Sequence, residues 1–194
     1  SFTARFNTAQ VLNTWDLMDA GTFAETVNER ADDIGTSRPF TDQQIAGYKA
    51  NGGTDWQDEI FRTATGQEYQ MDYSGGTDAV KYFISGNYLD QQGIVINSNF
   101  KRYSIRTNVA ANLAKNFDAR LKLNFIRRET NNVGGGGNAS GAIAGPTAWA
   151  PTTPARDENG VLTVRDPISS IKGNPIELAQ NDVIRENNNF MANG

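Results

Sequence analysis

The sequence of 194 residues contains no cysteine and no histidine. Without cysteine the chain can form no disulfide, has no thiol nucleophile and lacks the most common structural zinc ligand. Without histidine it also lacks the side chain that most often serves as a general base or metal ligand. No nucleophile–base pair or metal cluster can be assembled from the residues that remain. We therefore expect no enzymatic activity, no catalytic residue, no bound metal and no cofactor.

Long apolar runs are missing as well. No stretch approaches the roughly 20 apolar residues that a membrane-spanning helix needs, so a helical membrane protein is excluded. The formal net charge is −4, and acidic and basic residues are interspersed along the chain. A nucleic-acid-binding surface would instead concentrate basic residues on one face. We therefore expect no nucleic-acid partner.

What the sequence does contain is alternation with a period of two, in four segments. Alternate side chains of a strand point to opposite faces, and in each segment polar residues dominate one face while the other is apolar and aromatic. The segments are Glu68 to Gly75, Ala79 to Asp90, Phe100 to Leu113 and Phe117 to Glu129. The last three reach the roughly 9–11 residues that a tilted strand needs to cross a bilayer. The first is slightly shorter.

The connections between these segments alternate between short and long. Gly75-Gly76-Thr77-Asp78 predicts a tight hairpin turn, because glycine tolerates the positive φ that such turns require. Ala114-Lys115-Asn116 predicts a second short turn, whereas Gln91 to Asn99 and the run after Glu129 are longer. Outer-membrane barrels have short periplasmic turns and long extracellular loops in this order. A soluble antiparallel sheet packed on a core is the alternative, because such sheets alternate too.

These patterns predict a mainly β fold, an antiparallel up-and-down meander of about four strands with short flanking helices. Three regions follow from the same patterns. Residues 1–66 are expected to form a helical and loop segment leading into a barrel wall, residues 67–130 the four-stranded meander, and residues 131–194 an extracellular-type loop region with a short helix.

Helix starts are predicted at four places in the flanking regions. Three are capping boxes, in which a threonine and a glutamate or glutamine three residues later satisfy free backbone N–H groups. The fourth combines an asparagine N-cap with proline at the first helical position, and its helix is expected to run to about Ile184. The pairs are Thr22 with Glu25, Thr41 with Gln44, Thr54 with Gln57, and Asn174 with Pro175.

Two groups of side chains are candidates for ligand contact. Five cations lie on the polar face of the predicted strands and would face the lumen of a barrel. They are Arg102, Arg106, Arg120, Lys122 and Arg128. The alternative is that they form ordinary ion pairs with acids of the same wall. Trp56 and Trp149 lie outside the strands and could stack on a sugar, or else anchor a loop or an interface.

Three motifs, in this order, resemble the SusC/RagA-type TonB-dependent outer-membrane transporters. They are TDWQDEIFRTA at Thr54–Ala64, YFISGNYLDQQGI at Tyr82–Ile94 and NSNFKRYS at Asn97–Ser104. The resemblance covers about residues 54–131, and the flanks fit more loosely.

Proteins that this chain resembles have a periplasmic plug inside a large β-barrel of the bacterial outer membrane. With a surface-exposed, SusD-like lipoprotein lid they import glycans or peptides in Bacteroidetes-type bacteria, energised through the TonB complex. The resemblance therefore implies nutrient uptake, with an oligosaccharide or peptide as substrate and outer-membrane lipid around the wall.

The chain departs from this family in what it lacks. It has no TonB box, no plug and too few strands to close a barrel, so we expect a fragment of the early barrel region that is not transport-competent by itself. Open strand edges and an exposed apolar face favour pairing with another copy or coverage by the flanking helices. The alternative function is that of a soluble β-rich binding or adhesion module that uses its apolar face for a partner.

Overall fold

The structure is a computed structural model, and it describes residues 1–114, 117–133 and 141–193. The chain divides into two compact units. The first, which we call the sheet unit, combines Ser1–Gln10, Thr63–Asn132 and Val183–Gly194. The second, the loop unit, combines Val11–Arg62 with Val133–Asp182. Each unit is built from stretches that are far apart in the sequence.

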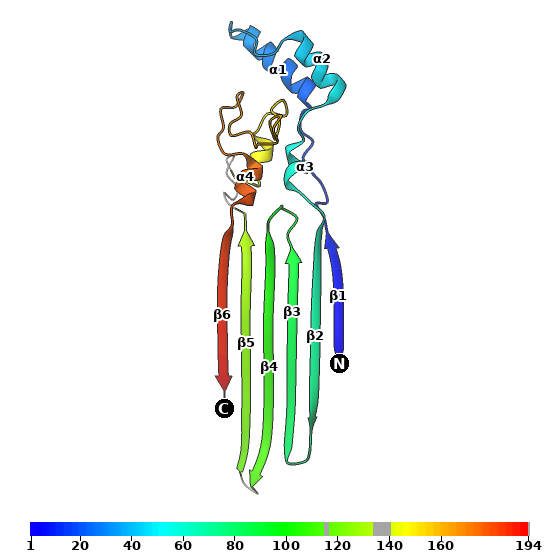
Figure 1. Ribbon diagram of the computed structural model, residues 1–194, viewed down its shortest axis with the longest axis vertical. Coiled ribbons are helices and arrows are strands. Elements are labelled where there is room, and N and C mark those ends of the chain that lie inside the picture. Colours follow the sequence, from blue (N-terminus) through cyan, green and yellow to red (C-terminus); the bar gives the residue numbers. More distant parts are fainter. Residues whose placement is uncertain (115–116, 134–140, 194) are drawn as a thin grey trace. The chain divides into compact units, whose positions relative to one another are not determined.

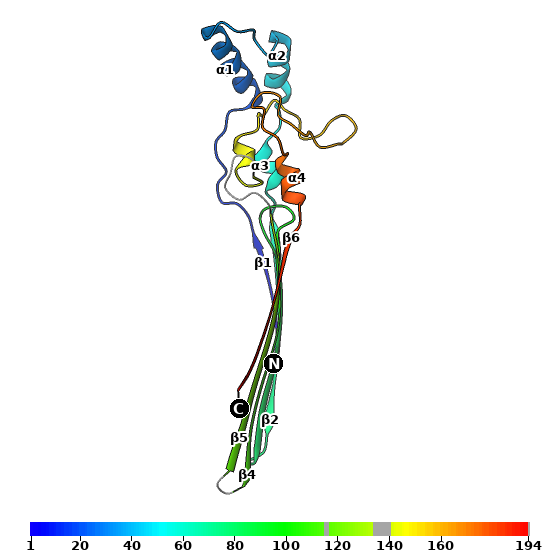
Figure 2. The same cartoon turned by 90° about the vertical axis from the view of Figure 1, so that its left-hand side faces the viewer.

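The sheet unit is a six-stranded antiparallel meander in which every strand pairs with its neighbours in sequence (Figure 1). Seen edge-on in Figure 2, the strands form one twisted layer. The longest strands have 16 residues, well beyond the 5–6 residues common in soluble sheets. The strands are β1 (Phe2–Ala9), β2 (Ala64–Gly76), β3 (Val80–Gln92), β4 (Asn99–Ala114), β5 (Phe117–Asn132) and β6 (Val183–Asn193).

The predicted meander is confirmed, with six strands where the sequence predicted about four. The four alternating segments correspond to β2 to β5, whereas β1 and β6 were not predicted. Strand β6 contains the polar run Glu186–Asn189, and asparagine has a low preference for strands. This strand therefore depends on its continuous pairing with β5, from Lys122↔Asn193 to Asn132↔Val183. Cross-strand pairing of this kind leaves little trace in the sequence of one strand.

The predicted hairpin turn after β2 is confirmed. The backbone N–H of Thr77 donates to the carbonyl oxygen of Val80 at 2.6 Å, and Gly76 has a φ of 149°. At the second predicted turn Ala114 pairs with Phe117, while Lys115 and Asn116 lie outside the described residues.

The loop unit contains short helices joined by irregular segments. Their bounds are α1 (Ala20–Asp33), α2 (Asp42–Asn51), α3 (Trp56–Ile60), a 3-10 turn η1 (Gly145–Thr147) and α4 (Pro175–Gln180). The capping box of Thr41 with Gln44 is present at the start of α2. Asn174 caps α4 as predicted, but the helix ends at Gln180 rather than near Ile184, because the chain enters β6 at Val183.

The two other predicted capping boxes are wrong. The N-cap of α1 is Asp19, whose carboxylate accepts from the Thr22 amide, and Thr22 lies in the first turn. The N-cap of α3 is Asp55, which accepts from the amides of Gln57 and Asp58. A carboxylate is well suited to this place because it also interacts favourably with the positive end of the helix.

Glycine is required at the β2–β3 turn. A Cβ on Gly76 would lie 2.2 Å from the Val80 carbonyl oxygen, and the positive φ adds backbone strain of about 1–3 kcal/mol for other residues. By contrast, a Cβ on Gly86, within β3, would have no neighbour inside 4 Å.

We therefore expect Gly76→Ala to impair assembly of the sheet and Gly86→Ala to leave it unchanged. The measurement is the strand content and the thermal unfolding midpoint of each variant, by circular dichroism. Equal losses for both variants would contradict the turn geometry.

Candidate functional site

The strand register separates the sheet into an apolar and a polar face. On the apolar face Met71 is opposite Gly86, which is opposite Ile105, which is opposite Phe125. Strand β1 adds to the same face, because Phe2 is opposite Met71. The predicted facing pattern is thus continuous across the strands.

Large side chains on the apolar face are exposed to an extent unusual for a soluble sheet. Met71 is 61% exposed, Ile105 55% and Phe190 65%. Within the described part of the sheet unit no second layer covers these side chains (Figure 2). An apolar surface of this kind needs a lipid or protein partner.

Tyrosines form a row across the apolar face near the ends of the strands that lead into the long connections. Tyr69, Tyr88 and Tyr103 are cross-strand neighbours, with ring centres 6.4 and 5.0 Å apart. The row continues in β5 as Arg127, opposite Tyr103, which pairs with Glu129 at 2.7 Å and with Glu186 at 3.3 Å in the next row of the same face. Aromatic residues between an apolar band and charged residues are typical of a membrane–water boundary.

The polar face carries a hydrogen-bonded network centred on Glu68. Its carboxylate accepts from Arg5 at 3.1 Å, from the Asn87 amide at 2.9 Å and from Arg102 at 3.4 Å. Arg102 also donates to Asn87, at 3.1 Å. Two rows along the same face Asp72 accepts from Ser85 at 2.6 Å. Such networks give the polar groups on this face of the sheet their hydrogen-bond partners, although no apolar core packs against it within the described part of the sheet unit.

All five candidate lumen residues lie on this polar face. Arg102 is opposite Arg128 and Arg106 is opposite Asn124, which fixes the facing of both strands. Arg102 is engaged by Glu68. The other four, Arg106, Arg120, Lys122 and Arg128, make no ion pair with any residue that the structure describes. Arg5 joins this face from β1, and sequence reasoning missed it because that strand was not predicted.

The candidate aromatic residues Trp56 and Trp149 pack against each other inside the loop unit. Their ring centres are 4.9 Å apart at an interplanar angle of 63°. Trp56 is 2% exposed and Trp149 3%. The indole N–H of Trp56 donates to the Ala150 carbonyl at 3.0 Å, whereas that of Trp149 has no hydrogen-bond partner among the described residues. This burial accords with the loop-anchoring alternative, and the stacking role stays a prediction.

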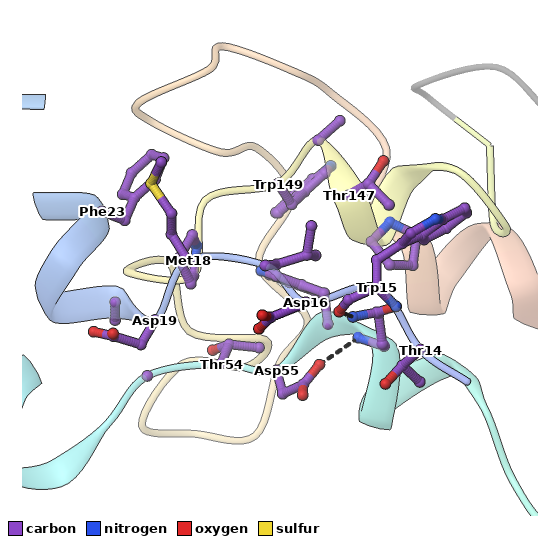
Figure 3. A pocket seen from close by; sticks show the side chains of 18 residues that line it. Thr14, Trp15, Asp16, Met18, Asp19, Phe23, Thr54, Asp55, Thr147 and Trp149 are labelled. Atoms are coloured by element: carbon purple, nitrogen blue, oxygen red, sulfur yellow. Dashed lines mark hydrogen bonds between the residues drawn. The ribbon is translucent and has the colours of Figure 1, made fainter. Parts of the chain in front are cut away.

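The two tryptophans also border a cavity of about 640 Å³ in the loop unit (Figure 3). The segment of residues 14–19 forms one wall, and Trp15 belongs to it. Gln57 holds this segment in place, because its side chain accepts from the Trp15 amide at 2.9 Å and donates to the Trp15 carbonyl at 2.8 Å. Sequence reasoning missed Trp15, which lies in an extended stretch without periodicity.

A buried carboxylate ties together the loop that carries Trp149. Asp166 accepts from the Thr153 hydroxyl at 2.7 Å and from the amides of Ala150 and Ile168, both at 3.1 Å. It also accepts from the amide and hydroxyl of Ser169. Burial raises the pKa of the Asp166 carboxyl, but these hydrogen bonds outweigh burial, so its pKa lies below the ordinary value.

Within the described residues no group of histidine, cysteine, aspartate and glutamate side chains could hold a metal ion. None of their helices is long and apolar enough to cross a membrane.

Comparison with known proteins gives a consistent result. The chain is 34% identical over 183 residues to the TonB-dependent receptor P3 of Formosa agariphila, covering 92% of the chain and 17% of the receptor. It is 37% identical over 101 residues to the TonB-dependent receptor SusC of Bacteroides thetaiotaomicron, covering 52% of the chain and 10% of SusC. No protein-family model matches.

The fold resembles that of a solved relative as well. A structure of the RagAB peptide transporter superposes with a TM-score of 0.69 at 19% identity, over 98% of this chain and 25% of that one. A structure of the RagAB peptide importer in its closed-closed state gives a TM-score of 0.65 at 20% identity, over 90% and 23%.

The long two-faced strands and these relatives define a segment of a TonB-dependent receptor, a class of proteins of the bacterial outer membrane. Within that class the chain is of the SusC/RagA type, as its motifs predicted. The chain spans about one-sixth of the first of these receptors. The relatives come from Formosa and Bacteroides, which agrees with the Bacteroidetes origin that the resemblance implied.

Replacing the Asp166 carboxylate should loosen the loop unit. Asp166→Asn leaves buried donors without an acceptor, and we expect it to lower the free energy of unfolding of this unit by about 3 kcal/mol. Asp157→Asn, in an exposed turn, is the control and should cost much less. Hydrogen exchange at the amides of Ala150 and Ser169 reports the difference. Equal protection in both variants would contradict the role of Asp166.

The same site predicts a pH dependence. Because its folded-state pKa is lowered, Asp166 contributes stability above its unfolded pKa of about 3.9, and this contribution is lost as the pH falls through the folded value. Protection at Ala150 should therefore decline below about pH 4 in the natural chain. The Asp166→Asn variant should lack that transition.

Proposed function

We propose that this chain is part of a TonB-dependent importer that takes up glycan or peptide oligomers across the bacterial outer membrane. The sheet unit would form part of the wall of the β-barrel. The loop unit would belong to the long connections on the cell surface. By itself the chain, with its open-edged sheet, would not transport.

The observation that carries this proposal is the two-faced sheet. One face exposes large apolar side chains such as Met71 and Ile105 beside a tyrosine row, and the other carries a hydrogen-bonded polar network. Lipid on the first face and water on the second would satisfy both. A soluble sheet would need its apolar face covered by a core.

The orientation follows from the connections. The hairpin between β2 and β3 is short, whereas the segments of the loop unit connect to the other end of β2 and to the ends of β1, β5 and β6 that the register places at the same end of the sheet. With short turns in the periplasm, the loop unit lies on the extracellular side. The tyrosine row would then mark the outer membrane–water boundary.

The polar face would line the lumen. Arg106, Arg120, Lys122 and Arg128, free of ion pairs within the described chain, would present positive charge there, next to Arg102 in its network with Glu68. Such a wall would attract anionic or hydroxyl-rich solutes through charge and hydrogen bonding.

The partners of the whole protein belong to the same proposal. The relatives are named as TonB-dependent receptors and, in RagAB, as a peptide importer or transporter. For the parent of this chain they support energy coupling to the TonB complex, a surface lipoprotein of the SusD type and an oligosaccharide or peptide substrate. A soluble binding or adhesion module is the alternative, in which a protein partner would cover the apolar face.

A matched pair of substitutions separates the two possibilities. Leu121 lies on the apolar face opposite Val109, and Asn124 lies on the polar face opposite Arg106. In a membrane wall, Leu121→Arg should cost about 2–4 kcal/mol near the bilayer midplane and block assembly. Asn124→Arg should be tolerated, since its side chain would meet water.

The measurement is the amount of heat-modifiable parent receptor in outer-membrane fractions. Loss with Leu121→Arg and normal levels with Asn124→Arg support the wall. The membrane-wall role of the sheet would be ruled out if the unsubstituted receptor were recovered as a soluble protein. Equal levels of both variants in the membrane would rule it out as well.

A further inference from the structure

A cluster of cations without acidic partners lies on the polar face toward the β2–β3 hairpin. At the other end of the same face, Arg5 and Arg102 both donate to Glu68. Four cations nearer the hairpin make no side-chain hydrogen bond or ion pair with any residue that the structure describes. They are Lys81, Arg106, Arg120 and Lys122. This part of the polar face therefore carries positive charge that the described chain does not neutralise.

The strand register gathers three of these cations around Ala110. Lys81 and Arg120 flank Ala110 in one cross-strand row, and Lys122 lies in the adjacent row, opposite Asn108. Neighbouring strands are about 4.8 Å apart, so the Cα atoms of Lys81 and Arg120 are separated by about 10 Å. Their long side chains can meet over this distance, because the methyl group of Ala110 leaves room between them.

The small side chain of Ala110 leaves a hollow of about 210 Å³. Its lining residues on the polar face are Lys81, Phe83, Asn108, Ala110, Arg120 and Lys122. The three cations and Ala110 are exposed, and Phe83 and Asn108 are half-buried. A solute can therefore reach the hollow and its charged groups. The volume is below the roughly 300–1,000 Å³ of a site that encloses a whole ligand, so the hollow suits one compact group of a larger molecule.

The acidic residues nearby do not neutralise these cations. Asp118 lies on the same face, opposite Asn112, and Asp78 lies in the hairpin turn. Neither carboxylate makes an ion pair within the described residues. Arg106 lies diagonally across from Lys122, and like charges on neighbouring strands repel each other. A surface lined by charge of one sign concentrates counter-ions, so this cluster attracts an anion from outside the sheet.

We propose that this hollow binds the phosphate group of an organic phosphate. A phosphate monoester carries up to two negative charges and three acceptor oxygens on one phosphorus atom. Arg120 provides a planar set of donors that matches phosphate geometry, while Lys81 and Lys122 add point charges. The Asn108 amide can donate a further hydrogen bond. The half-buried ring of Phe83 offers an apolar surface to the organic part of the molecule.

An acidic peptide segment is the competing ligand, because carboxylates also attract cations. Each carboxylate carries one charge and two oxygens, and successive acidic side chains of a peptide are spaced along its backbone. Three cations around a hollow of about 210 Å³ instead match several charges on one compact group. The site therefore favours a phosphate over a peptide.

The inference rests on the proposed function for its place in the lumen of the parent receptor, but binding can be measured separately from import. The purified parent receptor in detergent is titrated calorimetrically with phenyl phosphate, with inorganic phosphate and with hexaglutamate. We expect saturable binding of phenyl phosphate that weakens as the salt concentration rises, because salt screens exposed charges. Inorganic phosphate should bind more weakly, since it has no apolar part to contact Phe83, and hexaglutamate should bind least.

Variants of the lining residues then locate the site. Arg120→Gln and Lys122→Gln should each weaken phenyl phosphate binding roughly tenfold, and Arg120→Lys, which keeps the charge, should weaken it less. Phe83→Ala should remove the preference for phenyl phosphate over inorganic phosphate. Lys101→Gln is the control, because it removes the same charge from the opposite face of β4 and should bind as the natural chain does. Thermal unfolding of each variant shows whether the fold is kept.

The proposal is overturned if phenyl phosphate does not bind saturably, or if inorganic phosphate or hexaglutamate binds as tightly. Unchanged binding in Arg120→Gln and Lys122→Gln would also overturn it, as would an equal loss in Lys101→Gln, which would reflect net charge alone. Failure of the proposed import function has a different signature. In that case the receptor would bind phenyl phosphate with the expected variant pattern, yet deletion of its gene would leave nutrient uptake unchanged.

Discussion

The cross-strand register of the meander is the constraint on which the rest of the structure depends. Because the side-chain period of a strand is two, a slip of one residue in any pairing would move a whole row of side chains to the other face. The observed pairings keep Tyr69, Tyr88 and Tyr103 in one row and Glu68, Leu89 and Arg102 in the row behind. Apolar and polar side chains stay on separate faces, as the proposed wall requires, only while this register holds.

The register also explains why the sheet unit needs no core of its own. Its polar face is satisfied by hydrogen bonds such as those that Glu68 accepts from Arg5 and Asn87. Its apolar side chains are exposed and need a lipid or protein partner to cover them. The loop unit is stabilised differently, by the buried Trp56–Trp149 pair and by the hydrogen bonds to Asp166. The two units are therefore stabilised by different interactions.

Much of this fold could be predicted because the signal is local. The period-two alternation located β2 to β5, and glycine at Gly76 marked the hairpin. Strand β1 was missed although Phe2, Ala4 and Phe6 alternate with polar residues. Strand β6 was missed because it is rich in asparagine and depends on its pairing with β5. Helix starts at Thr22 and Thr54 failed for a related reason, since a nearby aspartate is the better cap.

The candidate site was less predictable than the fold. The facing of Arg102 and the four other cations follows from alternation and was predicted. The Glu68 network that holds Arg102 was not, because it joins four strands. The cavity requires Gln57 to hold Trp15 in place, across 42 residues of sequence. No pattern within a window of the sequence encodes such a contact.

The most direct test of the two-faced wall is a scan of spin-label accessibility along β4 in the parent receptor reconstituted in lipid. Labels are placed one at a time from Tyr103 to Ala110, and collision with oxygen, which partitions into lipid, is compared with collision with a water-soluble nickel chelate. The account predicts an alternation of period two, with odd positions such as Ile105 contacting oxygen and even positions such as Arg106 contacting the chelate. Uniform accessibility, or alternation in the opposite phase, would contradict it.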